Sequence, residues 1–191
     1  MIILNRRTSL LLSAAAIIIL GLLVYSNTFH ASFHFDDDSN IVANYAVRNV
    51  GASALFKFWA TRFLTYYSFA LDFSFHQLRV PGYHIFNLAV HIGAALTVWW
   101  LALLTLGTPA MKLHPHTTRF AGAPSPIKGE DGSGRPWLLA LFSGLLFVCH
   151  PVQTEAVTYI VQRATSLAAF FYLLALCLYI KSRLLQEPGD G

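Results

Sequence analysis

The 191-residue chain has little charge and almost no cysteine. Charged side chains make up 12% of the sequence, whereas soluble domains carry about 25%. This scarcity and the long apolar runs exclude an ordinary soluble domain and indicate a membrane protein. The net charge of +4 is small and not clustered, so no basic stripe for nucleic acid is present. The two cysteines, Cys149 and Cys177, lie in apolar runs, which predicts buried thiols and neither a disulfide nor a metal pair.

Four apolar segments are candidate membrane spans and predict an all-α integral membrane protein. They cover residues 10–25, 83–106, 136–152 and 164–180. The first segment exceeds a signal-peptide core and lacks a clear small-residue cleavage site, so we expect an uncleaved anchor. Residues 107–135 contain four prolines and several glycines, which predicts a loop. No internal repeat is found, and the chain is expected to form a single membrane module.

The distribution of lysine and arginine predicts the orientation of the spans. With both termini in the cytoplasm, eight basic residues lie inside and five outside, as the positive-inside rule requires. The outer face, periplasmic or lumenal, then carries the long segment 26–82 and the polar stretch that begins at His150. The outer segment is rich in aromatic residues around 51–59 and 61–77, which predicts one or two short helices in the membrane interface.

Three adjacent acids, Asp36, Asp37 and Asp38, follow the first span. Like charges this close cannot all ionise at their ordinary pKa, so one of them is a candidate general base, and adjacent acids also bind cations. The competing interpretation is a helix cap with solvated acids. On local sequence alone we favour the cap, because caps are far commoner than active sites.

His84, Asn87 and His91 recur at a spacing that places them on one face of the second span. Polar groups inside a span are either functional or bonded to neighbouring helices, and both interpretations stay open here. Glu155 and Arg163 follow the His150-Pro151 step. These two residues predict either a salt bridge, with each other or with the first outer segment, or a phosphate site at Arg163.

Three blocks of sequence resemble one family. They are FHFDDDSNIVANYAV, TRFLTYYSFALDFSFHQLRVPGYHIFNLAVH and HPVQTEAVTYIVQRATSLAAFFYLLAL. Together they are similar to the N-terminal membrane region of the transmembrane and tetratricopeptide-repeat proteins. These belong to the GT-C glycosyltransferases and include protein O-mannosyltransferase-like enzymes. The resemblance covers well over half of the chain, and the block that begins HPVQTE is the most specific.

The resemblance implies a partial GT-C fold and a sugar donor linked to polyprenyl or dolichyl phosphate. Asp36 matches the first acid of the family motif and is the expected base. Asp37 matches the second and would support the base or the donor phosphate, with a divalent cation as one means; Asp38 has no assigned role. Arg62 falls at the family's Arg-Pro-Leu position, although Phe63 replaces the proline. The other positions expected to line the donor site are His84, Asn87, His91, His150, Glu155 and Arg163.

Members of this family continue into further spans and then repeats, which this sequence lacks. We therefore expect part of a glycosyltransferase, inactive alone, whose partners are membrane lipid, the lipid-phosphate sugar and a second chain that supplies the missing parts. The alternative is a non-catalytic membrane subunit or scaffold that packs against partner helices. An ion transporter is disfavoured because no predicted span contains an acidic residue.

Overall fold

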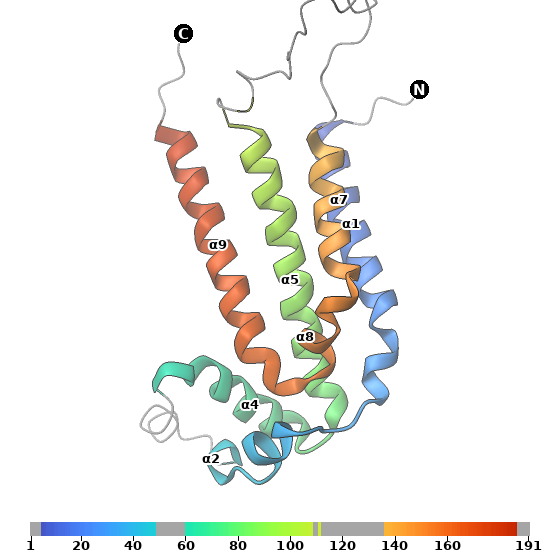
Figure 1. Cartoon of the computed structure of the whole chain (residues 1–191), viewed down its shortest axis with the longest axis vertical. Coiled ribbons are helices and arrows are strands. Elements are labelled where there is room, and N and C mark those ends of the chain that lie inside the picture. The colour runs from blue at the N-terminus through green and yellow to red at the C-terminus, as the bar shows by residue number, and fades with distance from the viewer. Residues whose placement is uncertain (1–4, 49–59, 109–110, 112–135, 187–191) are drawn as a thin grey trace, which may run out of the picture.

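The computed structural model describes residues 5–48, 60–108, 111 and 136–186, and this part of the chain contains helices and no strand. Four long helices run alongside one another (Figure 1): α1 (Arg6–Val24), α5 (Val80–Leu106), α7 (Pro136–Cys149) and α9 (Arg163–Gln186). Three of them are long and apolar enough to cross a membrane, and α7 becomes a fourth when joined to the bent segment Pro151–Thr158. The predicted all-α membrane protein is confirmed.

The ends of the long helices follow from identifiable side chains. The Asn5 side chain accepts a hydrogen bond from the Arg7 backbone N–H at 3.4 Å and so caps the start of α1. At the C-terminal side of the chain, α9 continues to Gln186, past the predicted end at residue 180. Lys181 there lies 5.7 Å from the centre of the Trp100 ring. A lysine in the last turns of a span keeps its ammonium near water while its stem covers apolar surface, so the charge does not end the helix.

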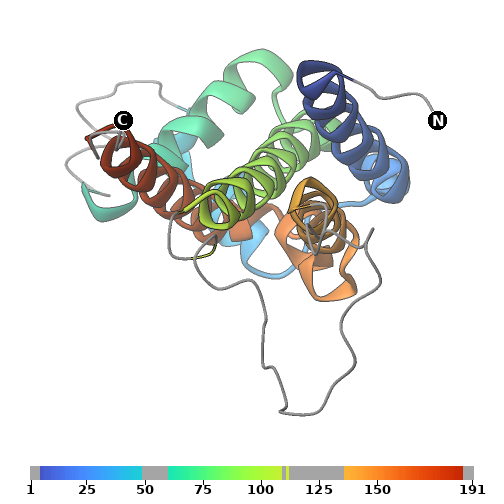
Figure 2. The ribbon, with the colours of Figure 1, turned by 90° about the horizontal axis from the view of Figure 1, so that it is seen from above.

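Helix α5 is central, with α7 and α9 packed on different sides of it (Figure 2). Helix α1 approaches α5 and α7 closely at two glycines. A Cβ on Gly21 would lie 2.9 Å from Ile92 Cγ1, and one on Gly144 would lie 2.7 Å from Ile17 Cδ1. A side chain at either position would therefore displace an isoleucine side chain, and glycine allows this close packing without such a shift. The core between these helices is made by the buried residues Ile17, Tyr25, Leu88, Ile92, Ala95, Val148 and Val157.

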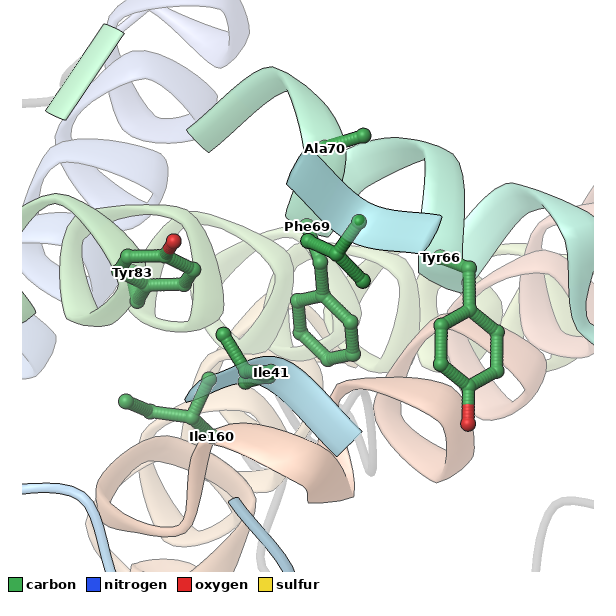
Figure 3. Packing of buried hydrophobic residues seen from close by; sticks show 7 residues of the cluster. Ile41, Tyr66, Phe69, Ala70, Tyr83 and Ile160 are labelled. Carbon is green, nitrogen blue, oxygen red and sulfur yellow. The ribbon is translucent and has the colours of Figure 1, made fainter. Parts of the chain in front are cut away.

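A second core lies at one end of the bundle, where α4 (Phe63–His76) crosses the starts of α5 and α9 (Figure 1). Helix α4 confirms the helix predicted over 61–77, whose place in the membrane interface stays a prediction, and the short α2 (Tyr45–Arg48) packs on it. The predicted helix over 51–59 lies outside the described residues. The core side chains interdigitate around Phe69 (Figure 3) and are Ile41, Val47, Tyr66, Phe69, Ala70, Tyr83 and Ile160.

We call the end of the bundle that carries α2, α4 and α8 (Thr154–Thr158) the acidic-loop end. The start of α1, the end of α5, the start of α7 and the end of α9 all lie at the opposite end (Figure 1). The acids at 36–38 and the stretch from His150 therefore share one end of the molecule, as the sequence predicts. Which end faces the cytoplasm stays a prediction, and the loop 107–135 lies almost entirely outside the described residues.

One prediction about the cysteines is wrong. Cys177 is buried, but Cys149 is exposed. Cys149 ends α7 because Pro151 has no backbone N–H and His150 adopts an extended conformation, with ψ of 128°. The chain then bends by 51° into the next segment. Cys149 lies on the same face of α7 as the exposed Phe142 and Leu146, so an apolar sequence run did not guarantee burial of every residue in it.

Candidate functional site

The three adjacent acids lie in different environments. Asp37 is buried, whereas Asp36 and Asp38 are exposed. Asp38 begins a single π-helical turn, η2 (Asp38–Val42), and no side-chain hydrogen bond caps this turn. The locally favoured prediction of a helix cap is therefore wrong. Asp36 and Asp37 instead contact the distant residues Tyr159 and Val161 in addition to their own loop.

Asp37 ties the acidic loop to the start of the last span. Its Oδ1 accepts a hydrogen bond from the Val161 backbone N–H at 2.9 Å, and its Oδ2 accepts one from the His34 backbone N–H at 3.1 Å. Burial raises the pKa of the Asp37 carboxyl, and the two backbone N–H groups act in the opposite direction. Both oxygens are engaged with backbone, so Asp37 holds the loop in place in this structure.

Asp36 has its backbone fixed, and its exposed carboxylate shares a hydrogen bond with the Tyr159 side chain. Its N–H donates to the Tyr159 hydroxyl at 3.3 Å, and its carbonyl accepts from Asn40 Nδ2 at 2.8 Å. The preceding residue, Phe35, has a φ of 50°, a left-handed conformation that a phenylalanine adopts at a cost. The Phe35 ring meets the Tyr159 ring edge-on at 6.2 Å between centroids. These contacts hold the strained turn that presents Asp36.

Arg62 belongs to the same surface as Asp36 through two intermediate side chains. The Tyr66 hydroxyl donates to Asn40 Oδ1 at 2.6 Å, and Asn40 in turn holds the Asp36 carbonyl. The Arg62 side chain hydrogen-bonds Tyr66. Arg62 itself is exposed. The structure therefore connects the predicted base with a predicted donor-site residue, although they are 26 positions apart in sequence.

The polar face of α5 is occupied by backbone carbonyls of the broken region 148–160. His84 Nδ1 lies 3.2 Å from the Val157 carbonyl oxygen, and His91 Nε2 lies 3.2 Å from the Val148 carbonyl oxygen. Both nitrogens must carry the proton to bond a carbonyl. Asn87 Nδ2 donates to the Ile160 carbonyl at 3.3 Å. A broken helix leaves carbonyls without intrahelical donors, and α5 supplies the donors that lipid cannot. The predicted bonding between helices is confirmed for all three residues.

Arg163 is fully buried and each of its side-chain nitrogens has a partner. Nε donates to Asn87 Oδ1 at 2.7 Å, and Nη2 donates to the Tyr83 carbonyl at 3.0 Å. Nη1 donates to Ser68 Oγ at 3.0 Å and forms an ion pair with Asp72 Oδ2 at 2.7 Å. Arg163 thus joins α4, α5 and α9. Of the two interpretations of this arginine, the geometry favours the salt bridge with the first outer segment.

The remaining predicted residues lie around the bend after α7. His150 is exposed, and its Nδ1 accepts a hydrogen bond from the Val152 N–H at 3.2 Å, which caps the turn η4 (Pro151–Gln153). Glu155 is exposed on α8 and lines a pocket of about 210 Å³ between α5, α8 and α9. Glu155 makes no salt bridge with Arg163 among the described residues. Donor binding by His150, Glu155 and Arg163 stays a prediction.

Comparison with known proteins identifies relatives of this sequence. The chain is 31% identical to protein O-mannosyl-transferase Tmtc3 of Drosophila melanogaster, over 90% of this chain and 19% of the relative. It is 33% identical to protein O-mannosyl-transferase tmtc2 of Xenopus laevis, over 85% of this chain and 18% of the relative. The chain is homologous to part of the TMTC protein O-mannosyl-transferases. It spans about a fifth of the length of these relatives. No family model and no solved structure matches it.

The described residues of this chain do not form a site for a divalent cation. They include no group of three or more histidine, cysteine, aspartate or glutamate side chains placed to hold a metal. Asp37, the predicted ligand, already accepts two backbone hydrogen bonds. A cation of this kind needs several oxygen ligands, and the described residues offer no acidic cluster of the required size at Asp37. No step of the proposed chemistry is therefore assigned to a metal.

Sequence analysis missed several residues of this chain that hold its candidate site together. Asp72 was visible only as a lone acid in the aromatic helix, and a buried charge of this kind needs a cation as its partner. No local sequence pattern marked Tyr159 or Asn40. Their roles come from hydrogen bonds with the backbone of Asp36, which lies 123 positions from Tyr159 and 4 positions from Asn40. Ser68 reads as an ordinary helix residue, yet it accepts a hydrogen bond from the Arg163 guanidinium.

Proposed function

We propose that this chain is the acidic-loop part of a membrane glycosyltransferase. The enzyme would move a sugar from a polyprenyl- or dolichyl-phosphate donor to a hydroxyl acceptor. Support comes from the relatives, which are named protein O-mannosyl-transferases. The single observation that carries the proposal is Asp36, an exposed carboxylate on a strained turn that Tyr159 braces from the far end of the sequence.

Asp36 is the proposed base. Its carboxylate takes the proton of the acceptor hydroxyl, and the hydroxyl oxygen forms a bond to the anomeric carbon of the sugar. The bond between that carbon and the phosphate oxygen breaks, and the lipid phosphate leaves with the electron pair. A single displacement of this kind inverts the configuration at the anomeric carbon. A positioned base contributes about 10²- to 10⁴-fold to such a step.

The other side chains divide into ligands and positioning residues. Arg62 is the proposed ligand of the donor phosphate, because it is exposed, cationic and linked to Asp36 through Tyr66. Arginine also matches phosphate geometry with paired N–H groups. Asp37 and Arg163 are positioning residues, since their polar atoms are engaged with other parts of the chain.

The whole reaction is proposed only for a longer assembly. The chain spans about a fifth of its relatives, so further spans would complete the walls of the site, and we expect no transfer by this chain alone. Both termini are proposed to be cytoplasmic, with Asp36 and Arg62 on the outer face. The positive-inside count of lysine and arginine supports this orientation.

The test is a chimera in which this chain replaces the matching part of the Drosophila relative. Transfer of labelled mannose from dolichyl phosphate to a serine- and threonine-containing peptide is then measured. We expect Asp36→Asn to reduce the rate by about 10²- to 10⁴-fold. Asp38→Asn, an exposed neighbour with no assigned role, is the matched control and should leave the rate unchanged. A wild-type rate in Asp36→Asn would refute Asp36 as the base and leave the non-catalytic membrane subunit as the alternative.

A further inference from the structure

Helix α9 carries a polar stripe on a side that no described helix covers. Figure 1 shows α9 at one side of the bundle, where it packs along α5 and, at its start, on α4 and α8. Of its apolar stretch, 11% is buried inside the structure, against 33% for α5. Four exposed polar residues recur at intervals of seven on the uncovered side, and they are Thr165, Tyr172, Tyr179 and Gln186.

Tyr172 lies near the middle of the span, and 71% of its side chain is exposed. At 1.5 Å per residue it is about 14 Å from the start of α9 at Arg163, and the apolar core of a bilayer is about 30 Å thick. The hydroxyls of Tyr172 and Tyr179 have no hydrogen-bond partner among the described residues. Tyr179 is close enough to the end of the span to reach the interface, but acyl chains offer the Tyr172 hydroxyl neither a donor nor an acceptor. Tyr172 therefore needs a polar group of another helix.

The first span shows what a face that meets only lipid contains. Its exposed residues between positions 11 and 24 are all leucine, isoleucine or valine, and they are Leu11, Leu12, Ile18, Ile19, Leu22, Leu23 and Val24. Such side chains have no polar atom to satisfy in the bilayer. The exposed side of α9 differs from this pattern at the same depth, so it is suited to contact with protein.

Small residues alternate with the polar stripe on the same side of α9. Each polar residue of the stripe except the last is followed three positions later by an exposed alanine or serine, and these are Ala168, Ala175 and Ser182. The two series occupy the a and d positions of one heptad repeat. Small side chains let two helix backbones approach closely in a membrane, and hydroxyl groups then bond across the contact. We call these seven residues the α9 heptad face.

The chemistry of the α9 heptad face matches a second copy of the same face. Copies of one chain enter the membrane in the same orientation, so their α9 helices run parallel. In a parallel pair each a or d residue faces its own equivalent. Tyr172 then meets Tyr172 of the second copy, and each hydroxyl can donate to or accept from the other. Lys181 lies on the opposite side of α9, 5.7 Å from the centre of the Trp100 ring of its own chain, so it does not obstruct this pairing.

We propose that this chain forms a parallel dimer through the α9 heptad face. The contact is isologous, with its twofold axis along the bilayer normal. Helix α5 covers the other side of α9, as it covers one side of α7 (Figure 2), so the dimer forms without a rearrangement of the bundle. The inference does not depend on the proposed sugar transfer, and the two proposals therefore fail separately.

The test measures association in liposomes. Copies of the 191-residue chain labelled at the N-terminus with a donor or an acceptor dye are mixed, and energy transfer is recorded over a range of protein-to-lipid ratios. Tyr172→Phe removes one hydroxyl from the face, and Ala168→Ile adds bulk at a d position. The matched controls are Tyr45→Phe at the acidic-loop end and Ala89→Ile on α5, both at exposed positions away from α9. Circular dichroism checks that all four variants keep the helical content of the wild type.

The proposal expects energy transfer above the level of random proximity in the wild type and both controls. Tyr172→Phe should weaken dimerisation by about threefold to tenfold, the value of one hydrogen bond between membrane helices. Ala168→Ile should weaken it by about tenfold or more, because a branched side chain overfills the close contact. A monomeric wild type, or equal association in face and control variants, overturns the proposal, and a helix of another protein segment then covers this face.

Disulfide trapping tests the parallel geometry. In a Cys149→Ser background, which removes the exposed thiol, Ala168→Cys and Ser182→Cys should each cross-link to the same position of the second copy on oxidation with copper phenanthroline. Lys181→Cys, on the α5 side of the same helix, is the matched control and should stay monomeric. Equal cross-linking at all three positions would overturn the proposed face. Cross-linking of position 168 only to position 182 would show an antiparallel pair and would overturn the proposed symmetry.

Discussion

Replacement of Arg163 by methionine tests whether this arginine holds the fold or binds the donor. In Arg163→Met, the Asp72 carboxylate stays in a site where its side chain is 11% exposed, with no cation beside it. Asn87 Oδ1 and Ser68 Oγ also lose their donor. Removal of one partner from a buried ion pair costs about 3–5 kcal/mol. We expect Arg163→Met to lower the free energy of unfolding by that amount.

The assay is thermal unfolding of the chain in lipid nanodiscs, followed by circular dichroism. For a chain of this length, 1 kcal/mol shifts Tm by about 2–4 °C, so the Tm of Arg163→Met should fall by roughly 6–20 °C. The double variant Arg163→Met, Asp72→Leu removes both charges. Apolar replacement of a complete buried pair is often neutral, so the double variant should recover at least half of the loss.

The competing result is equally clear. If Arg163 is a donor ligand without a structural role, Arg163→Met will unfold within about 2 °C of the wild type, a shift below 1 kcal/mol. The same change in the chimera will then weaken binding of the phosphate-containing donor. That pair of results would refute the structural reading of Arg163 and restore it to the donor site.

Two further changes test the polar contacts at the acidic-loop end. Burial raises the pKa of Asp37 above its ordinary value of 3.8, so the folded state binds this proton more tightly than the unfolded state. The contribution of Asp37 to folding stability is therefore fully present below pH 3.8 and is lost as the pH rises through the raised pKa of the folded state. Asp37→Asn removes this titration, so it should flatten that part of the profile of Tm against pH. His91→Leu leaves the Val148 carbonyl without its donor, and we expect a loss of about 1–3 kcal/mol in nanodisc unfolding. Thr105→Val, which removes an exposed hydroxyl bonded within its own helix, should cost less than 0.5 kcal/mol or so, and an equal loss in both variants would contradict the reasoning.

The helices could be predicted because their signals are local. An apolar run of about 20 residues crosses the bilayer as a helix whatever surrounds it, and the spacing of His84, Asn87 and His91 fixes a common face on any helix. The bend after α7 also has a local cause, since Pro151 cannot continue the backbone ladder. The spacing did not predict which groups these three side chains would bind. The carbonyls of 148–160 become available only because the chain breaks there.

The roles of the three acids could not be read from the sequence, because their local surroundings are nearly the same. Asp37 is distinguished by its contact with Val161, which is 124 positions away. The pairing of Arg163 with Asp72 depends in the same way on α4 folding back across the starts of α5 and α9. Contacts of this kind are set by tertiary packing, which a pattern over a few residues does not record.

The contacts also separate groups that maintain the fold from groups that are left for chemistry. His84, Asn87, Asp37 and Arg163 bond other parts of this chain, as buried polar groups near a membrane must. A side chain that satisfies the backbone of its own protein cannot also take a new ligand without releasing that backbone. Among the predicted site residues, the exposed Asp36, Arg62 and Glu155 carry charges that no salt bridge between described residues neutralises. Substrate contacts of the proposed transferase should therefore be sought at these three residues first.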